Sequence, residues 1–132
     1  MRGEVIDSSV LVAGFVKTDK FHKLAESQIV DLYNAKKTFH SSMLASVEVV
    51  GAVGRIVGDK EGGRVQRLLN EWQRKGYLRL YELNQLRMES AQNLAIKHNL
   101  KGADAIIVQI AWELKFPMIS YDNNVNKAVE NL

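Results

Sequence analysis

Apolar residues along the 132-residue chain follow two alternating patterns. Short, largely apolar runs predict buried strands, and longer segments with apolar residues three or four positions apart predict helices. The strands are expected at residues 5–7, 38–40, 78–83 and 118–120. The helices are expected at about residues 10–16, 21–35, 43–57, 65–76, 86–99, 103–114 and 125–132.

Strands separated by helices favour parallel pairing, because a parallel pair needs a long crossover connection. We therefore expect a single domain over residues 1–132, folded as a three-layer α/β/α sandwich around a parallel sheet. In such open sheets, functional sites lie beyond the carboxyl ends of the strands.

The composition is that of an ordinary globular domain, with 46% hydrophobic and 25% charged residues. The chain has no cysteine, which excludes disulfides, thiolate metal sites and a cysteine nucleophile. The longest strongly apolar run, residues 10–16, is far shorter than the roughly 20 residues that span a membrane. Asp7 interrupts the first apolar segment, unlike a secretory signal. We expect no membrane association and a cytoplasmic location.

Charge and histidine content narrow the possible ligands. The 18 basic and 15 acidic residues give a net charge of +3, which mildly favours a polyanionic partner such as a nucleic acid. The histidines, His22, His40 and His98, lack the paired spacing of zinc ligands. A zinc site is therefore not expected.

Four acidic residues stand in apolar contexts, where an ionised carboxylate needs a compensating partner. Asp7 follows the first predicted strand and Asp122 follows the last. Glu48 lies six residues after Ser42 within an apolar helix, and Asp104 begins the helix that precedes the last strand. Both helices begin at the carboxyl edge of the sheet, and helical side chains tilt toward the N-terminus. All four carboxylates are therefore expected at one rim.

Each acid also has a simpler explanation. Asp7 and Asp122 could cap helices, Asp104 could complement a helix dipole, and Glu48 could be an exposed helical residue. Four such coincidences at one rim are less probable than a shared function. Clustered carboxylates repel one another unless some are protonated or a hard cation neutralises them. Oxygen-only ligands select Mg²⁺ or Mn²⁺, and a water activated by such an ion can attack a phosphodiester.

The four acid-bearing segments resemble the motifs of the PIN-domain family, and more narrowly those of the VapC-type toxin ribonucleases. The similar segments, residues 5–12, 42–48, 101–108 and 119–122, read VIDSSVLV, SMLASVE, KGADAIIV and ISYD. Together they extend over nearly the whole chain. A hydroxyl residue stands six positions before Glu48 and two before Asp122, as in the family.

This resemblance implies a PIN-like fold and a divalent-metal-dependent endoribonuclease with Mg²⁺ or Mn²⁺ as its cofactor. The residues that match the family's metal ligands and catalytic acids are Asp7, Glu48, Asp104 and Asp122. Many relatives have a fifth edge strand in addition to four. We expect it to be absent here, because the chain stops soon after its final helix.

Further residues are candidates for the surroundings of these acids. Those expected to support the acids are Ser9, Ser42, Ser120 and Asn126. Ser9 and Ser42 are explained equally well as helix caps. Those expected to contact RNA are Arg55, Lys60, Arg64 and Lys101, although a solvated helix surface explains them at least as well. For Trp72 and Trp112, which lie on apolar helical faces, core or dimer packing is expected rather than base stacking.

The resemblance also implies partners, namely an RNA substrate, a small VapB-type antitoxin protein and a second copy of the chain in a homodimer. Two alternatives within the family remain open. One is an RNA-processing nuclease outside a toxin–antitoxin pair. The other is a PIN domain that binds without cleaving, although such domains typically lose acids that this chain keeps.

Two unrelated α/β classes fit less well. A phospho-accepting receiver module needs a central strand that ends in Asp and a late strand that ends in Lys, and neither occurs here. A haloacid-dehalogenase-like phosphatase needs Asp-x-Asp after the first strand, where this chain has Asp7-Ser8-Ser9.

Overall fold

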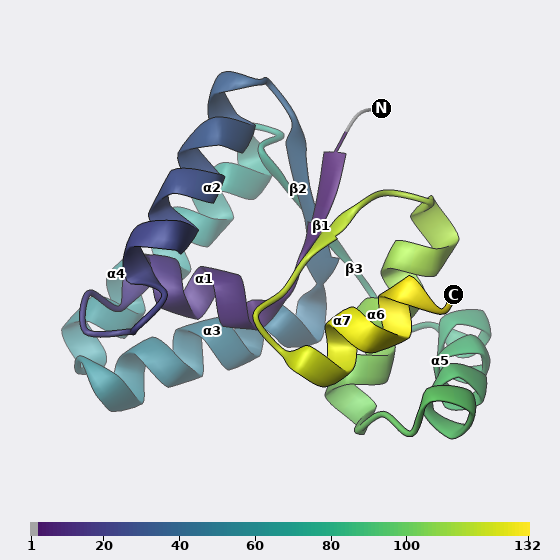
Figure 1. Cartoon of the computed structure of the whole chain (residues 1–132). Helices are drawn as coiled ribbons and strands as arrows, with labels where there is room; N and C mark the ends of the chain where they lie inside the picture. Colours follow the sequence, from purple (N-terminus) through teal and green to yellow (C-terminus); the bar gives the residue numbers. More distant parts are fainter. Residues whose placement is uncertain (1–2) are drawn as a thin grey trace.

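The computed structural model describes residues 3–132 and shows a central sheet with helices on both faces (Figure 1). The strands, β1 (Gly3–Ile6), β2 (Thr38–Ser42), β3 (Leu78–Tyr81) and β4 (Met118–Ile119), pair in the order β3-β2-β1-β4. Every pairing is parallel, and Val5 lies opposite both His40 and Met118. The predicted three-layer α/β/α fold is confirmed, with four strands in the part of the chain that the structure describes.

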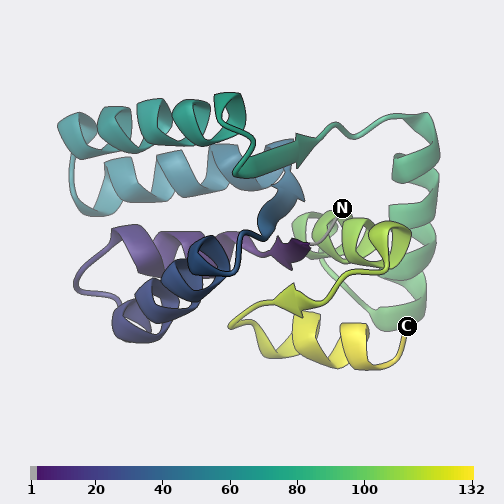
Figure 2. The same cartoon turned by 90° about the horizontal axis from the view of Figure 1, so that it is seen from above.

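The helices form two layers. They are α1 (Ser8–Phe15), α2 (His22–Asn34), α3 (Met43–Ile56), α4 (Asp59–Arg74), α5 (Gln85–His98), α6 (Gly102–Leu114) and α7 (Asn123–Glu130). Figure 2 shows α1 to α4 on one side of the sheet and α5 to α7 on the other. Between residues 3 and 132, no helix is both long enough and apolar enough to cross a membrane.

Each layer has its own apolar core. Ile6 packs with residues of α1 to α4, whereas its neighbour Val5 packs with residues of α5 to α7. Both side chains are completely buried, because successive residues of a strand point to opposite faces and β1 is covered on both. This explains why the first strand reads as a continuous apolar run that ends at Asp7.

The elements begin and end close to their predicted positions, with instructive exceptions. Helix α1 begins at Ser8, so its N-cap is Asp7 and not one of the serines that follow. Helix α4 begins at Asp59, before its apolar face starts, because its first turn is polar and exposed. Gly58 precedes it with a φ of 134°, a backbone conformation that favours glycine.

The chain connectivity places a crevice beside β1. The chain forms β1, β2 and β3 in one direction across the sheet, and then returns to place β4 on the other side of β1. In open parallel sheets, ligands bind where the strand order reverses in this way, outside the carboxyl ends of the strands. Asp7 follows β1 and Asp122 follows β4, so two of the predicted acids lie at this point.

Candidate functional site

A pocket of about 750 Å³ opens at the carboxyl edge of the sheet. Its walls come from α1, α3, the first turn of α6, the loop between α1 and α2, and the segment after β4. The four predicted acids all line this pocket: Asp7, Glu48, Asp104 and Asp122. The structure thus brings together carboxylates that are up to 115 positions apart in the sequence.

Asp7 is held firmly in place. The residue is 6% exposed, and its Oδ1 accepts a hydrogen bond from the Ser8 backbone N–H at 2.9 Å. Oδ2 accepts hydrogen bonds from the hydroxyl groups of Ser9 at 2.9 Å and Ser120 at 2.8 Å. Asp7 is therefore both the N-cap of α1 and a rigid carboxylate at the base of the pocket.

Asp122 is also held by hydrogen bonds. As the N-cap of α7, its Oδ1 accepts from the backbone N–H groups of Asn124 at 2.8 Å and Val125 at 3.1 Å. The Asp122 backbone N–H donates to the Ser120 hydroxyl at 3.0 Å, and this hydroxyl in turn donates to Asp7. One serine therefore connects the two acids at the ends of β1 and β4.

Glu48 and Asp104 are much less compensated. Within residues 3–132, neither forms an ion pair, and Asp104 forms no side-chain hydrogen bond. Burial raises the pKa of Glu48, the charge of Asp7 raises it further, and a hydrogen bond from the Ser8 hydroxyl partly opposes these effects. Burial raises the pKa of Asp104, as do the charges of Asp122 and Asp7, whereas Lys101 lowers it. Both carboxylates therefore lack a cationic partner of their own.

The donor set fits a hydrated divalent cation better than a fully protein-ligated one. In the described part of the chain, no three Asp, Glu or His side chains are grouped so that they could hold a metal ion. However, Mg²⁺ keeps several of its waters and often takes only one or two carboxylates from the protein. The pocket is lined by five carboxylates, the four predicted acids and Asp19, and two of them have raised pKa values. It suits such an ion because the ion would relieve their mutual repulsion.

The predicted supporting residues have different roles. Ser9 and Ser120 contact Asp7 directly, as described above. The Asn126 side-chain amide donates to the Ser120 backbone carbonyl at 2.9 Å, so it supports the segment that carries Ser120. Ser42 is the N-cap of α3, where its hydroxyl accepts from the Ala45 backbone N–H at 2.9 Å, and it does not line the pocket.

Of the four residues predicted to contact RNA, two lie at or near the pocket and two do not. Arg55 lines the pocket, and Lys101 is close enough to Asp104 to lower its pKa. Lys60 and Arg64 are not brought to the pocket. They lie on α4, and Figure 2 shows α3 between α4 and α1, so the helix that carries Glu48 separates them from the acids. Arg64 instead forms an exposed ion pair with Glu61.

Sequence reasoning missed several residues of the pocket. Ser8 contacts Glu48, and the pocket wall also includes Lys20, Phe21 and Tyr121. The position of Tyr121 between Ser120 and Asp122 is a usable signal, whereas Lys20 and Phe21 lie in a loop whose path no periodicity predicts.

The tryptophans have different environments. Trp72 packs in the core between Phe15 and Phe39, with ring centroids 5.8 and 5.7 Å away, as predicted. Trp112 is 44% exposed, so core packing is wrong for it, because its side of α6 faces solvent.

Comparison with known proteins identifies the family of this fold. The family model described as the PIN domain matches residues 5–131. The structure is similar to the crystal structure of Mycobacterium tuberculosis VapC20, described as a sarcin-ricin loop cleaving toxin, with a TM-score of 0.78 and 15% sequence identity. The similarity covers 96% of this chain and 95% of VapC20. No match is found among the curated proteins compared. Because the family model spans nearly the whole sequence, the chain belongs to the PIN-domain family.

Proposed function

We propose that this protein is a divalent-metal-dependent endoribonuclease whose active site is the acid-lined pocket. The observation that carries the proposal is the meeting of Asp7, Glu48, Asp104 and Asp122 in one pocket at the carboxyl edge of a PIN-type sheet. A structural role alone explains Asp7 and Asp122, which cap helices, but does not explain why Glu48 and Asp104 face the same pocket without a cation.

In this proposal, Asp7, Glu48, Asp104 and Asp122 hold Mg²⁺ or Mn²⁺ directly or through water. When bound, the ion supplies a water of lowered pKa and neutralises charge that develops on the phosphate. The protein contributes rigid positioning. Ser9 and Ser120 orient the Asp7 carboxylate, and the α7 backbone orients that of Asp122. These donors also hold both carboxylates in fixed orientations at the pocket.

The substrate is proposed to be RNA. Arg55 on α3 lines the pocket, and Lys101, directly before α6, is close enough to Asp104 to lower its pKa. We expect these two cations to contact phosphates of the RNA and to offset part of the repulsion between the acidic pocket and a polyanionic substrate.

A toxin of the VapC type is the form of this activity that we propose. The support is the likeness of the fold to VapC20 together with the four sequence motifs. A small VapB-type antitoxin and a homodimer are then the expected partners. An RNA-processing nuclease without an antitoxin is the second candidate. Co-expression with the neighbouring small reading frame, followed by affinity purification and mass spectrometry, separates the two.

The test of the nuclease proposal is cleavage of a panel of structured, labelled RNAs by the purified protein in Mg²⁺, Mn²⁺ or EDTA. We expect cleavage with a divalent ion, none in EDTA, and none with Asp122→Asn. Because Asn is as good an N-cap as Asp, this variant keeps α7 intact. Cleavage that persists in EDTA, or at an equal rate in Asp122→Asn, would contradict the proposal.

A further inference from the structure

The acid-lined pocket has an aromatic wall that the chemistry above does not use. Phe21 and Tyr121 both line the pocket, with ring centroids 4.8 Å apart and ring planes at 34°. Both side chains are half-buried: they pack against the apolar core and also present surface to the pocket. Tyr121 directly precedes Asp122, so the ring pair lies next to the proposed catalytic acids.

Both rings are held in place before any ligand binds. The Tyr121 backbone N–H donates to the Ser9 hydroxyl at 3.1 Å, and its own hydroxyl donates to Gln28 of α2. The Phe21 backbone N–H donates to Asp19 Oδ1 at 2.8 Å, which orders the loop before α2. A preorganised surface of this kind loses little conformational entropy when a ligand binds.

A lysine lies over one of the two rings. The Lys20 side chain is exposed, and its Nζ lies 5.0 Å from the centroid of the Phe21 ring. An exposed cation–π contact is weak compared with stacking of a nucleobase on an aromatic ring. A base can therefore displace the ammonium group, which stays within reach of the phosphate that the base carries. Aromatic rings beside cations are the composition of surfaces that bind single-stranded nucleic acid.

We propose that Phe21 and Tyr121 form a subsite for an unpaired nucleobase next to the cleaved phosphodiester, and that Lys20 binds the adjoining phosphate. This inference rests on the proposed nuclease function and adds to it a subsite that binds the base next to the cleaved phosphodiester. A base within a duplex is already stacked on its neighbours and cannot enter the subsite. Phe21 and Tyr121 are therefore specificity-determining residues of the proposed nuclease.

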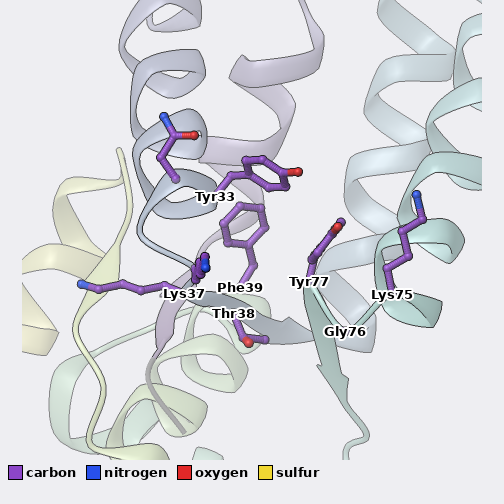
Figure 3. A pocket seen from close by; sticks show the side chains of 9 residues that line it. Tyr33, Lys37, Thr38, Phe39, Lys75, Gly76 and Tyr77 are labelled. Atoms are coloured by element: carbon purple, nitrogen blue, oxygen red, sulfur yellow. The ribbon is translucent and has the colours of Figure 1, made fainter.

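A second aromatic pocket provides a matched control. A hollow of about 580 Å³ lies at the opposite edge of the sheet, where β2 and β3 begin. Figure 3 shows the rings of Tyr33, Phe39 and Tyr77 close together in it. Two of its three lysines, Lys37 and Lys75, pair with Glu4 and Glu71. The four acids are not among its lining residues, so RNA bound there would not be presented to them.

The test compares two short ligands with the same number of phosphates, an oligoadenylate and an abasic ribose-phosphate chain. Their dissociation constants are measured in EDTA, where no cleavage occurs. The wild type should bind the oligoadenylate roughly 5- to 100-fold more tightly, the size expected for stacking of one base. Phe21→Leu and Tyr121→Leu keep apolar volume but remove the ring, and should lose most of this preference.

Three further variants define the role of each group. Tyr121→Phe keeps the ring and should keep the preference, and Tyr33→Leu should also keep it because Tyr33 lies at the opposite edge. Lys20→Gln should weaken binding of both ligands alike, because it removes only a phosphate contact. Circular dichroism melts establish that each variant is folded.

The outcomes separate this inference from the nuclease proposal. The inference is overturned if the wild type binds both ligands equally, if Phe21→Leu and Tyr121→Leu keep the preference, or if Tyr33→Leu removes it. These binding results do not depend on catalysis. Absence of metal-dependent cleavage in the wild type would instead defeat the nuclease proposal and leave the base subsite established.

Discussion

At the scale of single residues, the four predicted acids of the pocket form two pairs with different environments. Asp7 and Asp122 accept several hydrogen bonds and cap helices. Glu48 and Asp104 have raised pKa values because of burial and neighbouring carboxylates. The first pair is compensated by the fold itself, whereas the second pair requires a ligand. The uncompensated pair should therefore destabilise the metal-free protein.

The substitution Asp104→Asn isolates this effect, because Asp104 forms no side-chain hydrogen bond within residues 3–132. At neutral pH and without metal, we expect the variant to be more stable than the wild type by up to about 1 kcal/mol, the size of one screened charge interaction. A carboxyl group with a raised pKa in the folded state destabilises that state only when it is ionised. The advantage of the variant should therefore shrink as the pH falls through the raised pKa and vanish below about 4.

Thermal melts in EDTA at several pH values measure this difference. A variant that is less stable than the wild type at neutral pH, or whose advantage grows on acidification, would show that Asp104 is compensated in the folded protein.

Ser120 is the residue that connects the compensated pair. Its hydroxyl donates to Asp7 and accepts from the Asp122 backbone N–H, and it is 8% exposed. Ser120→Ala leaves both partners without this hydrogen bond in a buried site, and should cost about 1–3 kcal/mol of stability. The cleavage rate should fall as well, because Asp7 loses one of the groups that orient it.

Ser46→Ala is the matched control for Ser120→Ala. The Ser46 hydroxyl donates only to the Met43 carbonyl at the surface of α3, so its removal should cost less than about 0.5 kcal/mol. Urea denaturation of both variants provides the comparison. Equal losses of stability would mean that the hydrogen bonds of Ser120 stabilise the fold no more than that of an exposed serine.

At the scale of elements, helix N-termini position much of the site. Asp7 caps α1, Asp122 caps α7, and Ser42 caps α3, which carries Glu48 one and a half turns later. Asp104 lies in the first turn of α6. Asp7 and Asp122 therefore cap a helix and also line the pocket, whereas Ser42 caps a helix but does not line the pocket. Substitutions at the caps can distinguish the two roles.

We expect Asp122→Ala to lose about 1 kcal/mol of stability together with cleavage, whereas Asp122→Asn should lose cleavage alone. Ser42→Ala should show the reverse behaviour, with a similar loss of stability and cleavage retained, because Ser42 does not line the pocket. Melting temperatures and cleavage rates of the three variants measure these effects. Cleavage by Asp122→Asn at the wild-type rate would show that Asp122 is only a structural cap and would contradict the proposed active site.

The pattern of apolar and polar residues is enough to predict the helices and strands and the meeting of the four acids at one edge of the sheet. Alternating strands and helices leave few topologies, and a parallel sheet brings residues after its strands to one edge. The sequence alone does not identify the N-cap of α1, since Asp7, Ser8 and Ser9 can all cap a helix. The structure selects Asp7 because β1 ends at Ile6.

The surroundings of the acids are harder to predict, because they depend on how helices pack on one another. Lys60 and Arg64 follow Glu48 closely in sequence, but α4 packs on the side of α3 away from α1. Phe21 reaches the pocket only because Asp19 orders the loop before α2. Neither arrangement leaves a periodic signal in the chain.

At the scale of the whole molecule, two apolar cores support a single charged crevice. The cores on the two faces of the sheet share β1, and the acids come from elements of both layers. Helices α1 and α3 belong to one layer, and α6 and α7 to the other. A cation bound between these acids would connect the two layers, so metal binding should stabilise the whole fold.

We therefore expect Mg²⁺ to raise the melting temperature of the wild type. At a concentration about 100 times its Kd, a ligand that binds only the folded state adds about 2.7 kcal/mol. Asp104→Asn should show a much smaller rise, and so its advantage over the wild type in EDTA should reverse in Mg²⁺. Differential scanning calorimetry tests this directly. An equal shift in both proteins would place the bound ion elsewhere.

The central claim is that the acid-lined pocket is a metal-dependent ribonuclease centre, and the most direct test is the rate of RNA cleavage as a function of Mg²⁺ concentration. The comparison is between the wild type and Asp104→Asn, both shown to be folded. The account predicts a wild-type rate that rises to saturation with Mg²⁺ and a variant rate lower by on the order of 100-fold or more. Equal rates in the two proteins, or a wild-type rate independent of Mg²⁺, would contradict it.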